Sequence, residues 1–216
     1  MSIVKEGLVF IIPSLVLSLF SLLAGWWFLF VPFVLLAFAF CFFFRDPIRQ
    51  PPQDSDALLS PADGKVVKIQ NVESYPGFRS PVTMISIFLS LLDVHLTRAP
   101  ASGVVKEIEY RPGRFLKANK DEASLENEQK SVFLEGAQGI ILVKHIVGFA
   151  ARRIKCFVKK NEEVRRAQKI GLMYFGSRVD LYLPQDIQIK VGLNQKVKAG
   201  MTEIAEVSHG KKTETN

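Results

Sequence analysis

The chain has 216 residues, with 28 Lys and Arg against 21 Asp and Glu, which gives a formal net charge of +7. Its two cysteines, Cys41 and Cys156, are too few for a disulfide framework, and its three histidines lack the spacing of a zinc site, so no metal is expected. The positive charge suits anionic lipid or nucleic acid. No RNA-binding motif with clustered aromatic residues accompanies it, so nucleic acid is not an expected partner.

An uncharged, apolar segment covers residues 7–44. A helix needs about 20 apolar residues to cross the hydrocarbon of a bilayer, so this segment is too long for one span and suits two. We predict helices over residues 7–24 and 26–44, joined by a tight turn. Trp26 and Trp27 lie at this turn, and tryptophan prefers the membrane–water interface.

Basic residues flank both ends of the predicted helical hairpin. Lys5 precedes it, and Arg45 and Arg49 follow it. A hairpin places both of its ends on one side of the membrane, which the positive-inside rule makes the cytoplasmic face of the cell membrane. The alternative is a single long tilted span that exports the rest of the chain. Residues 1–44 are therefore expected to form a membrane anchor.

The remainder of the chain has the pattern of a β domain. Residues 45–56 are rich in Pro, Gln and Asp and are predicted to form an extended linker. Residues 57–216 contain short apolar or alternating runs separated by turn residues, which predicts one mainly β domain of ordinary size. The expected strands are at residues 58–59, 65–69, 82–92, 103–110, 131–134, 139–147 and 153–158.

A faint internal repeat relates residues 161–170 to residues 194–202, and residues 111–118 have a related rhythm. Each segment combines a turn, an apolar residue, a basic residue and a small residue. This pattern is similar to the hammerhead turns of biotinyl and lipoyl domains. It therefore predicts a compact β-sandwich of the barrel-sandwich type, and by itself indicates no chemistry.

The pair Gly176-Ser177 is a candidate self-cleavage site. The Ser177 hydroxyl can attack the Gly176 carbonyl, and β-elimination of the resulting ester followed by hydrolysis leaves a pyruvoyl group. A pyruvoyl group is an electrophilic ketone that captures amines, much as pyridoxal phosphate does. Glycine suits the first position because it has no side chain to block the attack. The competing interpretation is an ordinary turn, in which Gly-Ser pairs are common.

Several motifs follow one another in a fixed order along the chain. They are Phe-Phe-Arg-Asp-Pro at 43–47, Ser-Pro-Ala-Asp-Gly-Lys-Val at 60–66, Ser-Leu-Leu-Asp-Val-His at 90–95, Arg-Ala-Pro at 98–100, Gly-Val-Val at 103–105, Ala-Arg-Arg-Ile at 151–154 and Phe-Gly-Ser-Arg-Val-Asp at 175–180. In this order and spacing, which are more specific than any one motif, they resemble those of phosphatidylserine decarboxylases of the short archaeal and bacterial type. The resemblance covers nearly the whole chain.

The resemblance implies a pyruvoyl enzyme that converts phosphatidylserine to phosphatidylethanolamine. Residues 57–216 would be its catalytic domain, cleaved between Gly176 and Ser177 into a β chain of residues 1–176 and an α chain of residues 177–216. The two chains would form a heterodimer, with a higher oligomer left open. The other expected partners are the phosphatidylserine substrate and an anionic membrane surface.

The family uses an Asp-His-Ser set, which the resemblance carries to Asp63, His95 and Ser177. The long bacterial form has a second histidine, three residues further on, that serves self-cleavage; this chain has Arg98 there. His95 is therefore expected either to serve both steps or to leave the activation of Ser177 to another group. His145 and His209 match no motif and are interpreted as structural or exposed. The residues considered for the headgroup phosphate are the arginines, with Arg98 and Arg178 selected.

Two other interpretations remain. A membrane-tethered barrel-sandwich adaptor without activity would explain the repeat and the anchor, but not Asp63, His95 and Gly176-Ser177 together. A biotin or lipoyl carrier would need a lysine at a hairpin tip, and residues 183–186 contain none. Within the enzyme class, an archaeal ether-lipid serine would present the same headgroup chemistry, so the site residues do not distinguish it from phosphatidylserine.

Overall fold

The computed structural model describes residues 2–53, 57–114, 126–148, 153–175 and 177–207. The chain divides into two compact units. The helical unit comprises Met1–Ile48 with Leu91–Val94, and the sheet unit comprises Arg49–Ser90 with His95–Asn216.

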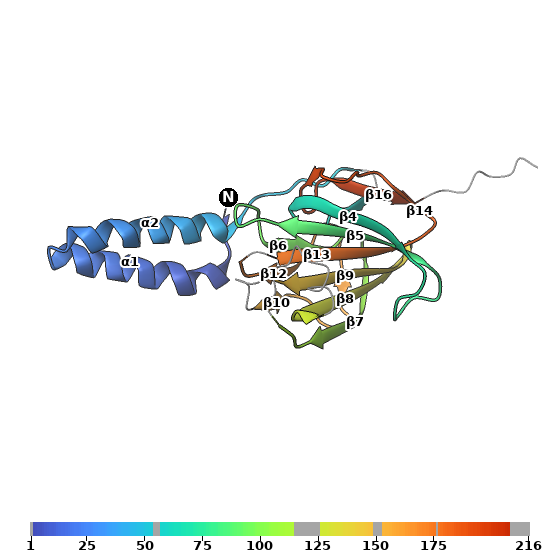
Figure 1. Cartoon of the computed structure of the whole chain (residues 1–216), viewed down its shortest axis with the longest axis horizontal. Helices are drawn as coiled ribbons and strands as arrows, with labels where there is room; N and C mark the ends of the chain where they lie inside the picture. Colours follow the sequence, from blue (N-terminus) through green and yellow to red (C-terminus); the bar gives the residue numbers. More distant parts are fainter. Residues whose placement is uncertain (1, 54–56, 115–125, 149–152, 176, 208–216) are drawn as a thin grey trace, which may run out of the picture. The chain divides into compact units, whose positions relative to one another are not determined.

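The helical unit is an antiparallel pair of helices, which a turn containing Gly25 at φ +73° connects (Figure 1). A short antiparallel pairing joins the segments that precede and follow the two helices. The elements of this unit are β1 (Ser2–Ile3), a 3-10 turn η1 (Lys5–Gly7), α1 (Leu8–Leu23), α2 (Trp27–Phe43) and β2 (Arg45–Asp46).

The buried face of α1 consists of three serines and Ile11, α2 buries Ala37 and Phe43, and most large apolar residues of both helices lie outside. Ser14, Ser18 and Ser21 are buried, and each hydroxyl donates to a backbone carbonyl of the preceding turn at 2.7 to 3.0 Å. The exposed positions are mostly Leu, Val and Phe. This distribution is the reverse of that in a water-soluble helical pair. By length and composition, the segment Lys5–Leu23 is long and apolar enough to cross a membrane, whereas α2 is a shorter apolar helix.

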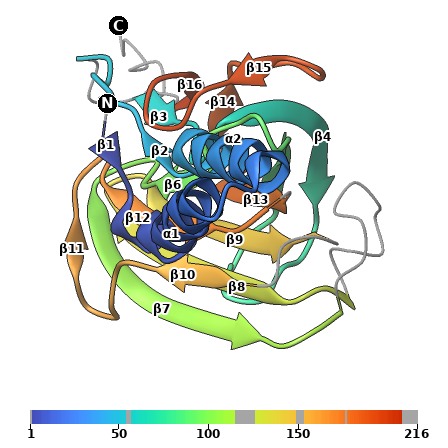
Figure 2. The same ribbon diagram turned by 90° about the vertical axis from the view of Figure 1, so that its left-hand side faces the viewer.

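The sheet unit is built around an antiparallel eight-stranded sheet in the order β11-β7-β8-β9-β13-β5-β4-β15, which curls around the core (Figure 2). Two three-stranded sheets, β10-β12-β6 and β14-β16-β3, complete the unit. The strands are β3 (Ala57–Leu59), β4 (Gly64–Val72), β5 (Val82–Leu89), β6 (Leu96–Arg98), β7 (Gly103–Arg111), β8 (Gln129–Gly136), β9 (Gly139–Val147), β10 (Ile154–Cys156), β11 (Glu163–Val164), β12 (Lys169–Met173), β13 (Ser177–Pro184), β14 (Ile187–Ile189), β15 (Lys196–Val197) and β16 (Glu203–Val207).

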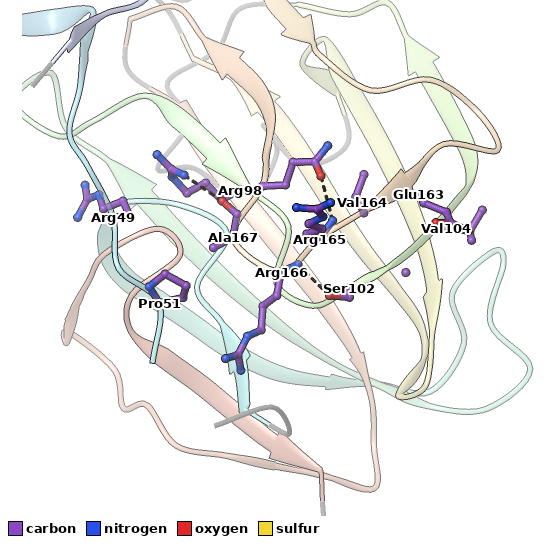
Figure 3. Close-up of a pocket in the computed structure, with 12 residues that line it drawn as sticks. Arg49, Pro51, Arg98, Ser102, Val104, Glu163, Val164, Arg165, Arg166 and Ala167 are labelled. Carbon is purple, nitrogen blue, oxygen red and sulfur yellow. Dashed lines mark hydrogen bonds between the residues drawn. The ribbon is translucent and has the colours of Figure 1, made fainter. Parts of the chain in front are cut away.

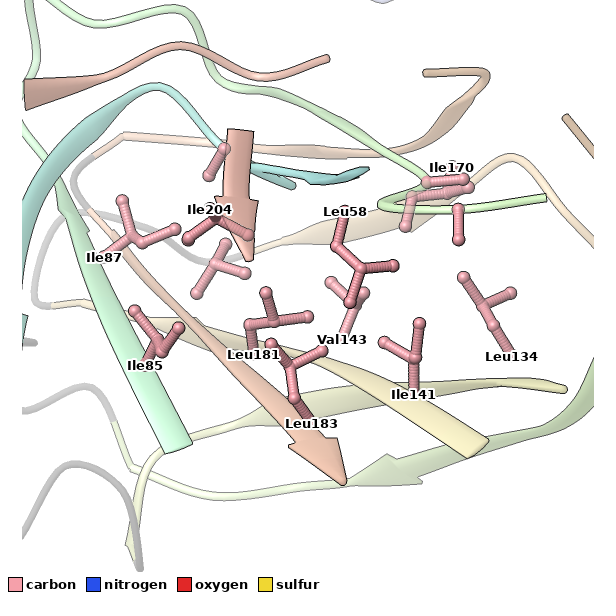
Figure 4. Close-up of a cluster of buried hydrophobic side chains, with 14 of the residues drawn as sticks. Leu58, Ile85, Ile87, Leu134, Ile141, Val143, Ile170, Leu181, Leu183 and Ile204 are labelled. Atoms are coloured by element: carbon pink, nitrogen blue, oxygen red, sulfur yellow. The ribbon is translucent and has the colours of Figure 1, made fainter. Parts of the chain in front are cut away.

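The core lies on one face of the large sheet, where aliphatic side chains from many strands meet (Figure 4). Successive residues of a strand point to opposite faces. In β13, Val179, Leu181 and Leu183 therefore join the core, and Ser177 shares their face. The labelled core residues are Leu58, Ile85, Ile87, Leu134, Ile141, Val143, Ile170, Leu181, Leu183 and Ile204.

The two main sequence repeats form the same backbone turn. Asn161 and Asn194 both have positive φ, at 66° and 67°. The Asn161 N–H donates to the Val105 carbonyl at 2.7 Å, and the Asn194 N–H donates to the Val66 carbonyl at 2.8 Å. Each turn then adds one short strand, β11 or β15, to an edge of the large sheet. The third segment, residues 111–118, lies partly outside the described residues.

The predicted strands correspond to β3, β4, β5, β7, β8, β9 and β10. The strand expected over residues 82–92 ends at Leu89, and Leu91–Val94 belong to the helical unit instead. The other strands of the sheet unit were not predicted, namely β6, β11, β12, β13, β14, β15 and β16. Among them, β13 pairs with both β9 and β5 near the middle of the sheet. The predicted mainly β composition is confirmed.

Gly64 allows the close approach of β4 to β5, and its replacement tests this contact. It has φ +150°, and a Cβ there would lie 2.2 Å from the Phe88 carbonyl oxygen. Gly64→Ala should lower the free energy of unfolding by roughly 2 kcal/mol or more, because both strain and a backbone clash arise. The measurement is thermal unfolding of the full chain in detergent. Gly192→Ala is the matched control, since a Cβ at Gly192 would meet no described atom within 4 Å; equal melting temperatures for the two variants would contradict this account.

Candidate functional site

Ser177 begins β13, where its backbone lies between Leu89 of β5 and Val147 of β9. The residue is fully buried, and among the described residues its Oγ has no hydrogen-bond partner. A buried hydroxyl without a partner is unfavourable by about 1–3 kcal/mol, so such groups are rare and call for an explanation. Gly176, the other half of the predicted cleavage site, lies outside the described residues.

Phe175 has a strained backbone two residues before Ser177. Its φ of 52° lies in the left-handed region, which a bulky L-residue rarely adopts. Strain of this kind is unfavourable by about 1–3 kcal/mol and occurs preferentially at functional sites. The backbone therefore has an unfavourable conformation at Phe175, directly before the predicted cleavage site.

His95 directly precedes β6 and is 1% exposed. Its backbone carbonyl accepts a hydrogen bond from the Met173 N–H at 3.0 Å, at the end of β12. Four residues later the chain reaches Ser177. The pairing of β6 with β12 thus places His95 beside the segment that leads to Ser177.

Both oxygens of the Asp63 carboxylate are bonded. Oδ2 accepts from Arg49 Nη2 at 2.7 Å, and Oδ1 accepts from the Ala199 N–H at 2.7 Å. The residue is 8% exposed, so this ion pair is largely shielded from water. Two donors on opposite oxygens hold the carboxylate in one orientation. Sequence reasoning identified Asp63 but neither of these partners, because they lie 14 residues upstream and 136 residues downstream.

A second turn of similar sequence explains why Asp63 bonds the Ala199 N–H. The sequence Pro-Ala-Asp-Gly at 61–64 recurs as Pro-Ala-Ser-Gly at 100–103, with Ser102 in place of Asp63. The Ser102 Oγ accepts from the Arg166 N–H at 2.9 Å, just as Asp63 Oδ1 accepts from Ala199. The two turns also exchange backbone hydrogen bonds of 2.9 Å, Leu59 N–H to the Pro100 carbonyl and Arg98 N–H to the Pro61 carbonyl. The bond to Asp63 Oδ1 therefore has a structural role that is common to both turns. The second oxygen, Oδ2, has no counterpart in Ser102, and it is the atom that bonds Arg49.

A basic cavity of about 950 Å³ lies along the Ser102 turn (Figure 3). Its lining includes four arginines, Arg49, Arg98, Arg165 and Arg166. Because Arg49 also bonds Asp63, this cavity and the Asp63 carboxylate share a residue. Arg98 donates to the Ala167 carbonyl at 2.9 Å, which holds its guanidinium at the cavity wall.

Arg178, the second arginine selected from the sequence, has a different environment. It is 3% exposed and its Nε lies 2.9 Å from Asp180 Oδ1, in a buried ion pair. Since adjacent residues of a strand alternate, Arg178 points to the face of β13 opposite that of Ser177. The structure therefore places Arg98 at a cavity and Arg178 in an internal ion pair.

His145 is a buried histidine that sequence motifs did not reveal. Its Nδ1 lies 3.1 Å from the Lys130 carbonyl, so this nitrogen carries the proton, and Nε2 accepts from Thr97 Oγ1 at 2.9 Å. Burial lowers the pKa of His145 to about 4, which keeps the ring neutral. By strand register, His145 lies on the same face of the sheet as Ser177, two residues from its partner Val147. His209 lies outside the described residues.

Comparison with known proteins identifies the family. The family model described as phosphatidylserine decarboxylase matches residues 36–205. A phosphatidylserine decarboxylase proenzyme of Wolbachia sp. subsp. Brugia malayi (strain TRS) is 40% identical over 213 residues, covering 96% of this chain and 92% of that protein. Proenzymes of the same name from Novosphingobium aromaticivorans and Magnetococcus marinus are 42% and 38% identical, and cover 95% and 94% of this chain and 87% and 94% of their own lengths. The chain belongs to the phosphatidylserine decarboxylase family, and the resemblance inferred from the motifs is confirmed.

The repeated turn offers a way to separate the turn bond of Asp63 from its expected part in self-cleavage. In Asp63→Ser the hydroxyl should keep the bond to the Ala199 N–H, as Ser102 does for Arg166, so the chain should fold while losing the carboxylate. We expect self-cleavage to be lost or slowed at least a hundredfold, the order of effect of removing a proton-transfer group. Gel analysis of the purified chain over time measures cleavage, and thermal unfolding measures stability.

Ser102→Ala is the matched control for that variant. It removes the equivalent turn bond, so it should lower the free energy of unfolding by about 1 kcal/mol and leave cleavage intact. If Asp63→Ser cleaved at the rate of the unmodified chain, Asp63 would have a structural role alone.

The neutral His145 ring predicts a pH dependence of stability. Because the pKa is about 4 in the folded chain and 6.5 ordinarily, the unfolded chain binds the proton first as the pH falls. Stability from this residue is complete above pH 6.5 and declines towards pH 4, by roughly 3 kcal/mol in all. His145→Gln should flatten the profile in that window. Denaturant unfolding at several pH values measures this, and parallel profiles for the two chains would refute it.

Proposed function

We propose that this chain decarboxylates phosphatidylserine to phosphatidylethanolamine, with a pyruvoyl group that it makes from Ser177. Cleavage between Gly176 and Ser177 gives a β chain of residues 1–176 and an α chain of residues 177–216, which stay together as a heterodimer. The observation that carries the proposal is the buried Ser177 Oγ without a described partner, in a chain of the phosphatidylserine decarboxylase family. The name proenzyme, which its relatives bear, fits a self-cleaving precursor.

Self-cleavage uses the side chain of Ser177 as the nucleophile. Its Oγ attacks the Gly176 carbonyl carbon, and the peptide C–N bond breaks as the ester forms and the Ser177 nitrogen takes a proton. Elimination then releases the Gly176 carboxylate and leaves a dehydroalanine, which takes up water and loses ammonia to become the pyruvoyl group. The left-handed conformation at Phe175 supports this step, because backbone strain raises the free energy of the uncleaved chain and so lowers the barrier to rearrangement.

Asp63 and His95 are proposed to serve the proton transfers. The two donors on the Asp63 carboxylate hold it in one orientation, and His95 is buried beside the chain segment that leads to Ser177. A histidine oriented by a carboxylate is a common base for a serine hydroxyl. His95 is assigned to proton transfer in decarboxylation and, with Asp63, to the activation of Ser177.

The pyruvoyl ketone supplies an electron sink for the electron pair that remains when the substrate carboxylate leaves as CO2. The residues around Ser177 fit such a group, since the position is fully buried and its neighbours on β5 and β9 are Leu89 and Val147. An apolar surrounding excludes water from the reacting carbon. Arg98, at the wall of the basic cavity, is proposed to bind the headgroup phosphate in preference to Arg178, which is paired with Asp180.

Residues 1–44 are proposed to anchor the enzyme as a two-helix membrane hairpin, with residues 45–56 as linker and residues 57–216 as a barrel-sandwich-like catalytic domain on the cytoplasmic face. The inverted distribution of side chains on α1 supports this, since its serines are inside and its large apolar residues are outside. At 1.5 Å per residue α1 is about 24 Å long, slightly less than a hydrocarbon core of about 30 Å. The expected surface partner is anionic lipid.

The first test is the intact mass of the denatured protein, with and without a hydrazide that reacts with carbonyls. We expect two chains that separate at Gly176/Ser177, with the hydrazide attached to the smaller one. Ser177→Ala should give one unlabelled chain and no decarboxylation of phosphatidylserine vesicles. Decarboxylation by that variant would refute the pyruvoyl mechanism.

A second test concerns His95. His95→Ala should lower kcat on phosphatidylserine by about a hundredfold or more, the range of a lost acid–base group. Activity is normalised to the amount of cleaved, hydrazide-reactive chain, so that a processing defect is not mistaken for a catalytic one. An unchanged normalised rate would remove His95 from the decarboxylation step.

A further inference from the structure

The loop between β5 and β6 carries two exposed leucines. Leu91 is 55% exposed and Leu92 is 71% exposed. The segment Leu91–Val94 belongs to the helical unit, whereas the residues on either side of it, Ser90 and His95, belong to the sheet unit. The loop therefore crosses from one unit to the other immediately before the proposed catalytic histidine.

Arg45 attaches this loop to the end of α2. Its guanidinium donates to the Phe42 carbonyl at 2.7 Å and to the Leu92 carbonyl at 2.6 Å, and it lies 3.9 Å above the Phe42 ring. An arginine at a helix C-terminus satisfies carbonyls that the helix leaves without a partner. Here the same side chain also bonds the backbone of the loop that carries the two leucines. Leu91 and Leu92 are therefore exposed in a loop conformation that a hydrogen bond stabilises.

Lipid is the occupant that best matches this apolar tip. The tip is in the same unit as α1 and α2, whose outward residues are apolar, so it extends a surface already suited to hydrocarbon. Two further exposed apolar residues of that unit, Ile3 and Ile48, flank the helical pair in sequence. Lys5 and Arg45 add positive charge at the same ends of the helices, which complements lipid phosphates.

We propose that Leu91 and Leu92 insert into the bilayer at the boundary between acyl chains and headgroups, with Arg45 at the level of the phosphates. This inference rests on the proposed function and extends it. His95 follows Leu92 by three residues, so its Cα lies within roughly 10 Å of that of Leu92. The headgroup layer is about 5–8 Å thick on each side of the hydrocarbon. A membrane-inserted Leu92 thus keeps His95 within reach of a serine headgroup that has not left the membrane.

Tryptophan fluorescence tests the insertion directly. The two native tryptophans, Trp26 and Trp27, are replaced by Phe, and Leu92→Trp is introduced into the full chain in vesicles of phosphatidylcholine and phosphatidylglycerol. We expect blue-shifted emission that lipids brominated high on the acyl chain quench more than lipids brominated near its end. Emission typical of water, quenched by aqueous iodide, would overturn the proposal.

Leu193→Trp in the same background is the matched control, because Leu193 is 60% exposed and lies in the sheet unit. Its emission should remain that of water. The alternative to lipid is that the exposed leucines contact a second copy of the chain. Blue-shifted emission from Leu92→Trp that depends on protein concentration and ignores brominated lipid would identify that occupant and refute insertion.

Kinetics supply the functional part of the test. The double variant Leu91→Ser, Leu92→Ser should raise KM on phosphatidylserine vesicles by about tenfold, through lost burial of two leucines. The effect on a dispersed short-chain phosphatidylserine should be much smaller. An equal loss on both substrates would contradict a membrane role for the loop. If the unmodified chain were inactive on both, the proposed function would fail, and the quenching result would still decide whether the loop inserts.

Discussion

The burial of the Ser177 hydroxyl without a described partner is the constraint around which the rest of the sheet unit is arranged. β13 holds this residue by pairing along its length with β5 and over most of its length with β9, and the next core residues on its face, Val179 and Leu181, are fully buried. A hydroxyl in such a place stabilises nothing in the folded chain. Its retention is understandable if the group is consumed in a reaction, and the left-handed Phe175 just before it indicates the same.

The repeated turns explain how an ordinary β scaffold accommodates the largely buried carboxylate of Asp63. Ser102 and Asp63 occupy equivalent positions, and each accepts a hydrogen bond from a backbone N–H of one of the two repeated segments, Arg166 or Ala199. Each turn thus needs one side-chain oxygen that accepts this hydrogen bond. Aspartate supplies a second one, and Arg49, from the segment between the helices and the sheet, is bonded to it. The charge is tolerated in a nearly buried place because it is paired and fully bonded.

In the proposed function the helical unit meets the membrane and the sheet unit carries the reaction, because a lipid substrate is met at the membrane while its headgroup reacts away from water. Arg45 and Arg49 are four residues apart, and each bonds a residue to which a role is proposed above. Arg45 bonds the carbonyl of Leu92 and Arg49 bonds the carboxylate of Asp63. The short segment after α2 therefore supplies one bonded arginine to each unit.

Sequence by itself determined the apolar helices, the strands β3, β4, β5 and β7 to β10, the repeat and the family, because hydrophobic periodicity and motif order are local properties of the chain. It did not reveal the other strands of the sheet unit, β13 among them, nor the Arg49 and Ala199 bonds to Asp63, nor the environment of His145. Only the tertiary structure decided these, and also that Arg98 lines a cavity while Arg178 is paired internally. The physical reason is that such contacts join residues far apart in the chain, and strand register alone decides which side chains share a face.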